Sequence, residues 1–451
     1  MPLPPEAARA LGDLGRFGIH LGLDHVRRLA AALGEPQLAV PCVLVAGTNG
    51  KGSTAALLAA MAAAGGLSAG LYTSPHLEDV TERLRLGGRP VDGGALGAAV
   101  LAVVAAARRL PDGPPTYFET LTAAAWLVLR DAAVDLAVTE VGLGGRLDAT
   151  NVAEPLLSVV TPIALEHQAL LGDTLAAVAR EKAGVLRRGR PAVAWGSEPE
   201  VRRALAAAAA EAGAELGFAD DEVRILEVAA RAPVPWGGLR VVLETPLAGR
   251  HQAVNLALAV RAAERLGEAG LAVGEEAIRR GAAEVRWPGR LESVEVPGVP
   301  GAPGAPGAPG APGAPARRVV LDAAHNPAGA EALAAFLDEA GTAAGPAAPR
   351  PVLVFGVLRD KQAEEMLPPL AGRAGRVVLT RPPGERGRDP RELLPLLPPG
   401  GTGTQVEPDP GRAVERALAS AGGGTVVVCG SIFLVGVVRG WLRERFGVPA
   451  A

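Results

Sequence analysis

The sequence has few aromatic residues, few cysteines and no strong excess of either charge, and each shortage argues against a class of function. Phe, Trp and Tyr make up 3% of the 451 residues, so a surface for stacking nucleic-acid bases is not expected. The formal net charge of −3 at pH 7 provides no basic footprint for nucleic acid either. Small polyanions stay possible as ligands, because a local pocket can be basic on a nearly neutral protein.

The cysteines and the apolar stretches indicate a soluble, cytoplasmic protein without a membrane partner. Cys42 and Cys429 each lie in a short apolar run of β type, which is typical of core residues in a reducing compartment. Residues 1–16 lack the apolar core of a signal peptide. The apolar stretches near 93–107 and 422–438 are diluted by Ala or Gly and fall short of the ~20 residues that a membrane span needs.

Short runs of β-branched residues alternate with longer helical stretches along the chain. Seven runs are predicted to be buried strands, at residues 41–46, 135–141, 156–161, 318–322, 351–355, 376–380 and 425–429. This alternation predicts an α/β fold of βαβ units with mainly parallel sheets. Ligands of such sheets bind beyond the carboxyl ends of the strands, where the polar motifs of this sequence lie.

Residues 301–315 are five Gly-Ala-Pro triplets. A collagen triple helix shares this period, but five triplets inside a globular chain favour a solvated, semi-extended linker. The length of the chain predicts more than one domain. The expected organisation is a first domain over 1–296, a linker over 297–316 and a second domain over 317–451.

The clearest motif follows the first predicted strand and consists of Gly47, Thr48, Asn49, Gly50, Lys51, Gly52 and Ser53. A helix is expected to begin just after Lys51 and to run to about Ala64. The backbone N–H groups of such a turn and helix N-terminus bind phosphate groups. Lys51 adds a positive charge, and the Ser53 hydroxyl can assist Mg²⁺ binding. The spacing is not that of the ordinary P-loop, because Gly52 follows the lysine. A glycine turn that only caps a helix would not need the lysine.

A second motif begins with Glu140 at the end of a predicted strand and continues to Asn151. A carboxylate opposite a phosphate loop suits Mg²⁺, which takes hard oxygen ligands and few protein contacts. The alternative for Glu140 is a capping or ion-paired acid. His167 follows the next strand and could be a second metal ligand, although a histidine in this place is often structural. Lys182, considered alone, would be a surface lysine.

Taken in order, these motifs resemble the folylpolyglutamate synthase/dihydrofolate synthase family of the Mur-ligase superfamily. The resemblance runs from residues 21–26 to 428–431 and includes residues 72–77, 249–255, 287–290 and 322–327. It implies an N-terminal P-loop ATPase domain and a smaller Rossmann-like C-terminal domain, with the active site in the cleft between them. The implied reaction is ATP-dependent addition of L-glutamate to a folate through an acyl phosphate. The resemblance also implies a monomer that acts on small molecules.

The resemblance assigns roles to individual residues of this sequence. It implies that the catalytic residues are Lys51, Lys182 and His325, with Lys182 carbamylated. Beyond the phosphate loop, ATP is expected to contact Asn255, Arg290 and Asp322. Two Mg²⁺ ions are implied, with the ligands Ser74, Glu140 and His167. The pterin part of the substrate is expected to contact Thr116, Tyr117, Phe118, Glu119, Asp148 and Ala149.

Two features depart from the family pattern. Position 166 is Glu where Asp usually precedes the histidine, so the extra methylene is expected to shift the loop that carries His167. The Gly-Ala-Pro repeat is an insertion between Arg290 and Asp322, where related chains have a short turn.

Three alternatives stay open. Another Mur-type amino-acid ligase is disfavoured by residues 147–151 and by a phosphate loop that starts at residue 47, ahead of which the peptidoglycan ligases carry a further domain. A regulatory or scaffold protein that lost the chemistry is disfavoured by retention of the lysine and metal-ligand positions. Within the family, an enzyme that only extends glutamate tails is possible, but residues 116–119 and 147–150 look more like the bifunctional enzymes that also act on dihydropteroate.

Overall fold

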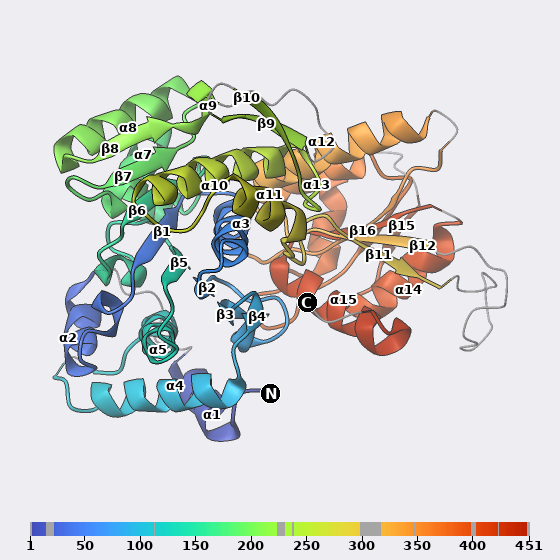
Figure 1. Ribbon diagram of the computed structural model, residues 1–451. Helices are drawn as coiled ribbons and strands as arrows, with labels where there is room; N and C mark the ends of the chain where they lie inside the picture. Colours follow the sequence, from blue (N-terminus) through green and yellow to red (C-terminus); the bar gives the residue numbers. More distant parts are fainter. Residues whose placement is uncertain are drawn as a thin grey trace. The chain divides into compact units, whose positions relative to one another are not determined.

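The chain folds into two compact units, which are seen in the computed structural model of Figure 1. The structure describes residues 2–14, 22–111, 113–222, 231–236, 239–297, 317–345, 348–397, 403–422 and 424–448. Unit 1 contains residues 1–246 and 251–286, and unit 2 contains residues 247–250 and 287–451. None of the helices in the described ranges is long and apolar enough to cross a membrane.

Unit 1 is built on an eight-stranded sheet in the order β4-β3-β2-β5-β1-β6-β7-β8. The strands, in that order, are Arg89–Pro90, Leu84–Leu86, Ala69–Tyr72, Leu136–Glu140, Cys42–Ala46, Leu157–Val160, Pro191–Ala194 and Glu215–Phe218. All neighbours from β2 to β8 pair in parallel, and only the β2–β3 and β3–β4 pairs are antiparallel. A separate antiparallel hairpin consists of β9 (Arg231–Trp236) and β10 (Leu239–Glu244).

The helices of unit 1 connect these strands. They are α1 (Pro5–Leu14), α2 (Asp24–Ala32), α3 (Lys51–Ala64), α4 (Gly93–Ala107), α5 (Tyr117–Asp131), α6 (Gln168–Leu171), α7 (Leu175–Lys182), α8 (Pro199–Ala212), α9 (Ala219–Glu222), α10 (Arg250–Glu268) and α11 (Glu275–Glu284). Burial of their apolar faces stabilises the unit, because each fully buried aliphatic or aromatic side chain contributes about 1.5–3 kcal/mol.

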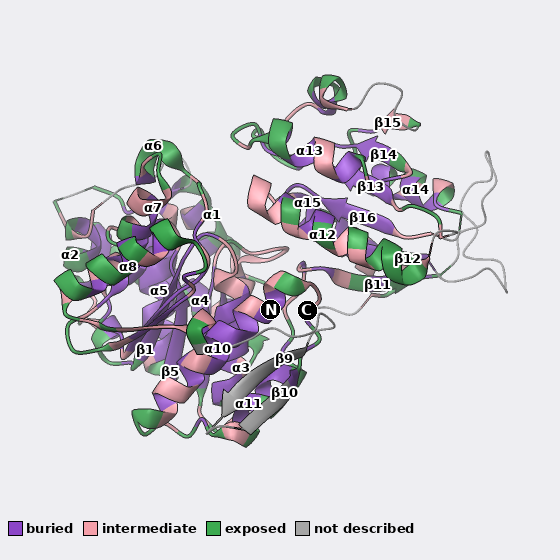
Figure 2. Ribbon diagram, turned by 90° about the horizontal axis from the view of Figure 1, so that it is seen from above, coloured by how far each residue is buried: buried purple, intermediate pink, exposed green. Residues whose placement is uncertain are grey.

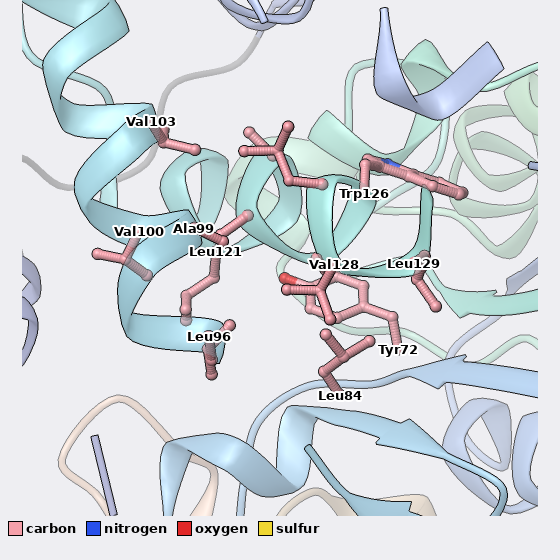
Figure 3. Packing of buried hydrophobic residues seen from close by; sticks show 14 of the residues in the cluster. Tyr72, Leu84, Leu96, Ala99, Val100, Val103, Leu121, Trp126, Val128 and Leu129 are labelled. Atoms are coloured by element: carbon pink, nitrogen blue, oxygen red, sulfur yellow. The ribbon is translucent and has the colours of Figure 1, made fainter. Parts of the chain in front are cut away.

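A large apolar cluster of unit 1 lies where α4 and α5 cover β2 and β3. Figure 3 shows side chains from these elements meeting, among them Tyr72, Leu84, Leu96, Leu121 and Trp126. The strands β1, β5 and β6 in the middle of the sheet are buried along their whole length, as Figure 2 shows for β1 and β5. This packing fixes the carboxyl ends of the three strands, and the site is built on those ends.

Unit 2 has a six-stranded sheet in the order β11-β12-β16-β13-β14-β15. The strands are Glu292–Val296, Arg317–Leu321, Val426–Cys429, Val352–Phe355, Arg376–Leu379 and Thr404–Val406. The β11–β12 pair is antiparallel and the others are parallel. The helices are α12 (Pro327–Ala344), α13 (Ala363–Ala371), α14 (Pro410–Ser420) and α15 (Ile432–Phe446).

The predicted α/β class with mainly parallel sheets is confirmed. All seven predicted strands are present, as β1, β5, β6, β12, β13, β14 and β16, each end within one residue of its prediction. The antiparallel strands β3, β4, β9, β10 and β11 and the parallel strands β7, β8 and β15 were not among these predictions. Strand β11 pairs with β12 in unit 2, whereas the boundary predicted after residue 296 assigns it to the first domain. Most of the predicted linker, residues 298–316, lies outside the described residues.

Candidate active site

The loop Gly47–Gly50 follows β1 in the middle of the first sheet. Strand register places Val45 beside Glu140 of β5 and Ala46 beside Val160 of β6, so the ends of the three strands meet at this loop. A Cβ on Gly47 would lie 1.9 Å from Oγ1 of Thr161, which excludes any other residue there without a shift. The loop is therefore pressed against the strand that leads to Glu166 and His167.

Hydrogen bonds tie the loop to the chain that follows β6. The backbone N–H of Thr48 donates to the carbonyl of Pro162 at 3.1 Å. The Thr48 hydroxyl donates to the carbonyl of Ala164 at 3.0 Å and accepts from the Ala164 N–H at 3.1 Å. The phosphate loop and the segment that carries His167 are therefore held as one piece.

Helix α3 begins at Lys51, whereas its start was predicted just after this residue, and it has no side-chain cap at Gly50. The first N–H groups of a helix have no partner within it, and together with the helix dipole they favour an anion. The Nζ of Lys51 donates to the carbonyls of Gly47 and Thr48 at 3.0 and 2.9 Å, so the side chain curls back over the loop. Ser53 is buried in the first turn. The arrangement suits a phosphate chain.

Lys182, at the end of α7, is a buried cation rather than a surface lysine. Only 1% of the residue is exposed. Its Nζ donates to the carbonyl of Gly47 at 2.8 Å and to Oε1 of Glu166 at 2.6 Å. Burial, together with the charge of Lys51, lowers the pKa of Lys182 to about 8. Glu166 could not be predicted as its partner from the sequence, because two side chains on different segments meet only through the fold.

Glu166 is the carboxylate that balances these two lysines. Burial alone would raise the pKa of Glu166, but the charges of Lys51 and Lys182 outweigh it and lower the pKa to about 2. The carboxylate is therefore ionised at neutral pH. The neighbouring His167 has a φ of 45°, a left-handed conformation that is uncommon for a residue other than glycine and often marks functional loops.

Glu140 lies at the end of β5, beside the loop that follows β2. Its Oε2 accepts the backbone N–H of Ser74 at 3.0 Å, and the carboxylate is buried. The two predicted metal ligands Glu140 and Ser74 are thus neighbours. Within the described part of the chain, no group of three or more His, Cys, Asp and Glu side chains is placed to hold a metal ion. The donors at this point, one carboxylate and one hydroxyl, are the oxygen type that Mg²⁺ prefers.

The predicted substrate segment forms the start of α5. Thr116 and Glu119 close a capping box, in which each side chain accepts the other residue's backbone N–H. Oε1 of Glu119 lies 3.1 Å from Nδ1 of His25, and both residues are buried. The ring of Phe118 packs against Gly142, where an added Cβ would lie 2.4 Å from Cζ. Hydrogen bonds and packing therefore fix this segment on both sides.

Asp148 anchors the glycine-rich loop that follows β5. Its carboxylate accepts the N–H of Leu143 at 2.8 Å and the N–H and hydroxyl of Thr150 at 3.0 and 2.6 Å. Burial raises its pKa, although these bonds act in the opposite direction. Asp148 is also the N-cap of the short 3-10 helix η4 (Ala149–Val152). The predicted substrate residues Asp148 and Ala149 thus lie on a rigid turn.

The same loop packs on the backbone that carries Lys182. A Cβ on Gly145 would lie 2.6 Å from the Lys182 carbonyl. Nδ2 of Asn151 donates to the carbonyls of Arg146 and Gly184, both at 3.0 Å. Asn151 therefore joins the glycine-rich loop to the end of α7. In the sequence, Asn151 is distinguished only as the last residue of a motif.

Asn255 of α10 lies against the phosphate loop of the same unit. A Cβ on Gly50 would lie 2.1 Å from Oδ1 of Asn255, and Gly50 has a φ of 90°. Nδ2 of Asn255 donates to Oε1 of Gln252 at 2.9 Å, and both amides are buried. The predicted nucleotide residue thus touches the loop, with Gln252 as a partner that was not predicted.

In unit 2, Arg290, Asp322 and His325 are brought together at the start of β11 and the end of β12. Asp322 accepts the N–H of Leu291 and of Ala324, both at 2.9 Å. Leu291 has a left-handed φ of 49°, which is strained for a bulky residue. Nδ1 of His325 lies 2.9 Å from the carbonyl of Ala323. Asp322 therefore stabilises the strained turn that follows Arg290.

Comparisons with known proteins show the family to which the chain belongs. The model of the Mur ligase middle domain matches residues 45–263, and that of the Mur ligase glutamate ligase domain matches residues 312–432. A dihydrofolate synthase/folylpolyglutamate synthase of Escherichia coli is 34% identical, over 98% of this chain and 97% of its own length. The chain spans about half the length of two other relatives, probable bifunctional folylpolyglutamate synthase/dihydropteroate synthases of Haloferax volcanii and Halobacterium salinarum (50% and 52%).

Two solved structures resemble the whole chain. E. coli FolC in complex with DHPP and ADP has a TM-score of 0.83 and 33% identity, and covers 99% of this chain and 100% of its own. A bifunctional folylpolyglutamate synthase/dihydrofolate synthase with Mn, AMPPNP and L-glutamate bound has a TM-score of 0.80 and 31% identity, and covers 97% of this chain and 98% of its own. The chain thus belongs to the folylpolyglutamate synthase/dihydrofolate synthase family of Mur ligases.

Proposed function

We propose that the protein is an ATP-dependent ligase that adds L-glutamate to folates and to 7,8-dihydropteroate through an acyl phosphate. The observation that carries the proposal is the phosphate loop on which Lys51 and Lys182 both converge at Gly47, next to Glu140 and Ser74. The similar solved structures hold ADP with DHPP in one case, and AMPPNP with Mn and L-glutamate in the other. We further expect a monomer that acts on small molecules in the cytoplasm.

The phosphate loop would bind the phosphates of ATP. The N–H groups at the start of α3 favour bound anions. Lys51, which lies over the loop carbonyls, would contact the γ-phosphoryl group during its transfer. Phosphoryl transfer depends mainly on positioning and on neutralising charge, so no protein nucleophile is required. In the same proposal, Asn255, Arg290 and Asp322 contact the nucleotide and His325 lies near it.

Ser74, Glu140 and His167 would hold Mg²⁺, with two ions expected. The bound metal would neutralise phosphate charge and polarise the reacting groups. Lys182 would be carbamylated, which replaces a cation by a carboxylate-like group. Carbamylation requires a neutral amine, and the lowered pKa of Lys182 supports it, since the neutral fraction at pH 7 is larger than for an ordinary lysine.

The pterin would contact Thr116–Glu119 and the turn at Asp148 and Ala149. Both carboxylates of this region are buried and used in caps, so the backbone around them presents a fixed surface. A rigid surface of this kind reduces the entropy lost on binding. The resemblance of residues 116–119 to bifunctional relatives supports dihydropteroate as a second substrate.

The test is phosphate release that depends on ATP, Mg²⁺ and L-glutamate, with dihydropteroate and tetrahydrofolate supplied separately. Release with both substrates would support the bifunctional enzyme. Release with tetrahydrofolate alone would reduce the proposal to tail extension. No phosphate release with either substrate would reject the proposal. A panel of acceptor substrates would then test for the other Mur-type amino-acid ligases.

A further inference from the structure

Arg83 is a buried cation without a carboxylate partner. It ends the 3-10 helix η3 (Val80–Arg83) and is 9% exposed. Among the residues that the structure describes, no carboxylate lies within ion-pair distance of its guanidinium. Its Nε donates to Nδ1 of His76 at 3.0 Å, and its Cζ lies 5.4 Å from the centroid of the Tyr117 ring. A buried charge is costly unless it is paired, so this position favours an anion.

Two of the acids that shortly precede Arg83 are already used by the backbone. Glu82 accepts the N–H groups of residues 77, 78 and 79 at 2.9–3.1 Å. Asp79 accepts the N–H and the hydroxyl of Thr81 at 2.9 and 2.6 Å. These bonds form a capping box that fixes the turn before Arg83. Arg83 is therefore held in place by its neighbours but is not neutralised by them.

Most of the donors of Arg83 stay available. A guanidinium has five N–H donors, and in the described part of the chain only Nε donates to a protein group. The two terminal nitrogens form the planar edge that binds a carboxylate through two parallel hydrogen bonds. The His76 and Tyr117 contacts orient the guanidinium without using that edge.

The place of Arg83 in the site suggests which anion it binds. His76 follows the proposed metal ligand Ser74 by two residues, and Tyr117 belongs to the proposed pterin segment. Arg83 thus touches both the loop at the metal and the segment at the pterin. A ligand group between the reacting carboxylate and the pterin ring would meet it.

The two proposed substrates differ at this point. Dihydropteroate has one carboxylate, which reacts. A folate ends in glutamate, whose γ-carboxylate reacts while the α-carboxylate keeps its charge and needs a cation. Two other cations of unit 1 near the site are paired with acids, Lys182 with Glu166 and Arg146 with Glu181, and Lys51 donates to the loop carbonyls.

We propose that Arg83 binds the non-reacting α-carboxylate of the terminal glutamate of a folate, and that it serves tail extension but not dihydrofolate synthesis. The inference rests on the proposed function and adds a residue that separates its two reactions. A carboxylate held by Arg83 would fix the direction of the glutamate, so that the γ-carboxylate faces the metal loop.

The test compares Arg83→Met, which keeps the apolar part of the side chain, with Arg83→Lys in the full-length protein. Initial rates are measured with tetrahydrofolate and with dihydropteroate at saturating ATP and L-glutamate. We expect Arg83→Met to raise KM for tetrahydrofolate about 10- to 100-fold, the usual range for a lost hydrogen bond to a charged group. The kcat/KM with dihydropteroate should change by less than about threefold. Arg83→Lys should fall between, because it keeps the charge and loses the planar edge.

A substrate analogue gives the second arm of the experiment. A tetrahydrofolate with 4-aminobutyrate in place of glutamate keeps the reacting carboxylate and lacks the α-carboxylate. Wild-type protein should lose the same factor on this analogue that Arg83→Met loses on tetrahydrofolate, and the variant should lose nothing more. Arg89→Gln, an exposed arginine on the next strand, should leave both activities unchanged.

Several outcomes would overturn the proposal. An equal loss with both substrates would mean that Arg83 supports the fold or the reacting carboxylate. An additional loss of Arg83→Met on the analogue would mean the same. An unchanged KM for tetrahydrofolate would also reject it. Wild-type protein that is inactive with both substrates would instead reject the proposed function, so the two failures are distinguishable.

Discussion

The polar residues at the strand ends of the two units are used in different ways. In unit 1 they reach far along the sequence: Lys182 donates to Gly47, and the Thr48 hydroxyl to Ala164, across 135 and 116 residues. In unit 2 Asp322 accepts from Ala324 within one turn and from Leu291 across 31 residues, and Asn326 caps α12. The arrangement in unit 1 places buried charged groups close to one another, which is typical of reactive sites. The arrangement in unit 2 fixes a backbone shape.

The strongest test of this contrast removes a charge from unit 1. We expect Lys51→Ala and Glu140→Ala each to lower kcat by about 10³-fold or more, because preorganised charges usually contribute most of the rate enhancement in such reactions. The measurement is phosphate release with saturating substrates. Near-normal turnover in either variant would mean that the γ-phosphate and metal site is placed wrongly. Unchanged circular dichroism and melting temperature would show that the loss is not one of folding.

Two glycines with left-handed φ values distinguish an effect on the site from an effect of ordinary backbone strain. Gly50 and Gly66 have nearly equal φ, 90° and 91°, but a Cβ on Gly50 meets Asn255 at 2.1 Å and a Cβ on Gly66 meets nothing within 4 Å. Both alanine variants should lose about 1–2 kcal/mol of stability from left-handed strain. Only Gly50→Ala should also lose turnover, by about 100-fold, because it displaces the phosphate loop. Equal turnover in the two variants would contradict the assigned loop.

In the uncarbamylated protein, the pair of Lys182 with Glu166 predicts a dependence of stability on pH. The pKa of Glu166 is about 2 in the folded protein, below its ordinary value of 4.5. Between these values the unfolded chain binds more protons than the folded one, so the stabilisation is present above about pH 4.5 and lost as the pH falls toward 2. Urea unfolding of wild type and Glu166→Gln over this range should show a smaller acid dependence in the variant. Parallel curves would rule out the pair as the cause.

In unit 2, Asp322→Ala should lower the stability of the turn that follows Arg290. It leaves the N–H groups of Leu291 and Ala324 without their acceptor, which is expected to cost about 1–3 kcal/mol. Leu291 should then leave its strained conformation, and the KM for ATP should rise if the turn also serves the nucleotide. Asp338→Ala, an exposed acid of the same unit, is the control and should cost less than about 0.5 kcal/mol. Equal stability of the two variants would contradict the role of the turn.

Much of the fold could be predicted because apolar strands and glycine turns are local signals. The start of α3 at Lys51 and the strand ends at Glu140 and Leu321 lie within one residue of their predictions, because they follow from runs of a few residues. Strand β11 was missed because it has two valines among polar residues and no continuous β-branched run, and its pairing depends on residue 317 and beyond.

The parts of the site that could not be predicted depend on contacts between distant segments. The pairing of Glu166 with Lys182, the contact of His25 with Glu119 and the bonds of Asn151 join residues of different elements. No spacing in the sequence encodes them. Arg83 has the same character, because its isolation from acids is evident only when Asp79 and Glu82 are seen to bind the backbone.

Deletion of the Gly-Ala-Pro repeat, residues 301–315, should have the smallest effect. The repeat lies outside the described residues, but the strands on either side are neighbours: Val296 pairs with Arg317 in antiparallel register. The sheet therefore holds the ends of the connection together. Closure entropy changes by only about 0.6 kcal/mol for each doubling of loop length, and residues 297–300 and 316 would remain to make the turn, a length that hairpins commonly use.

We therefore expect the deletion protein to turn over both substrates at rates within about twofold of wild type. A change of this size in closure entropy should leave the strand ends in place. The measurement is kcat with each substrate, beside the melting temperature. A soluble deletion protein whose turnover collapses would show that the repeat contributes to catalysis. Strands β11 and β12 flank both the repeat and the turn at Asp322. A loss of stability without a loss of turnover would therefore place the effect of the deletion in the sheet of unit 2. The reaction would then still depend on the charged residues of unit 1.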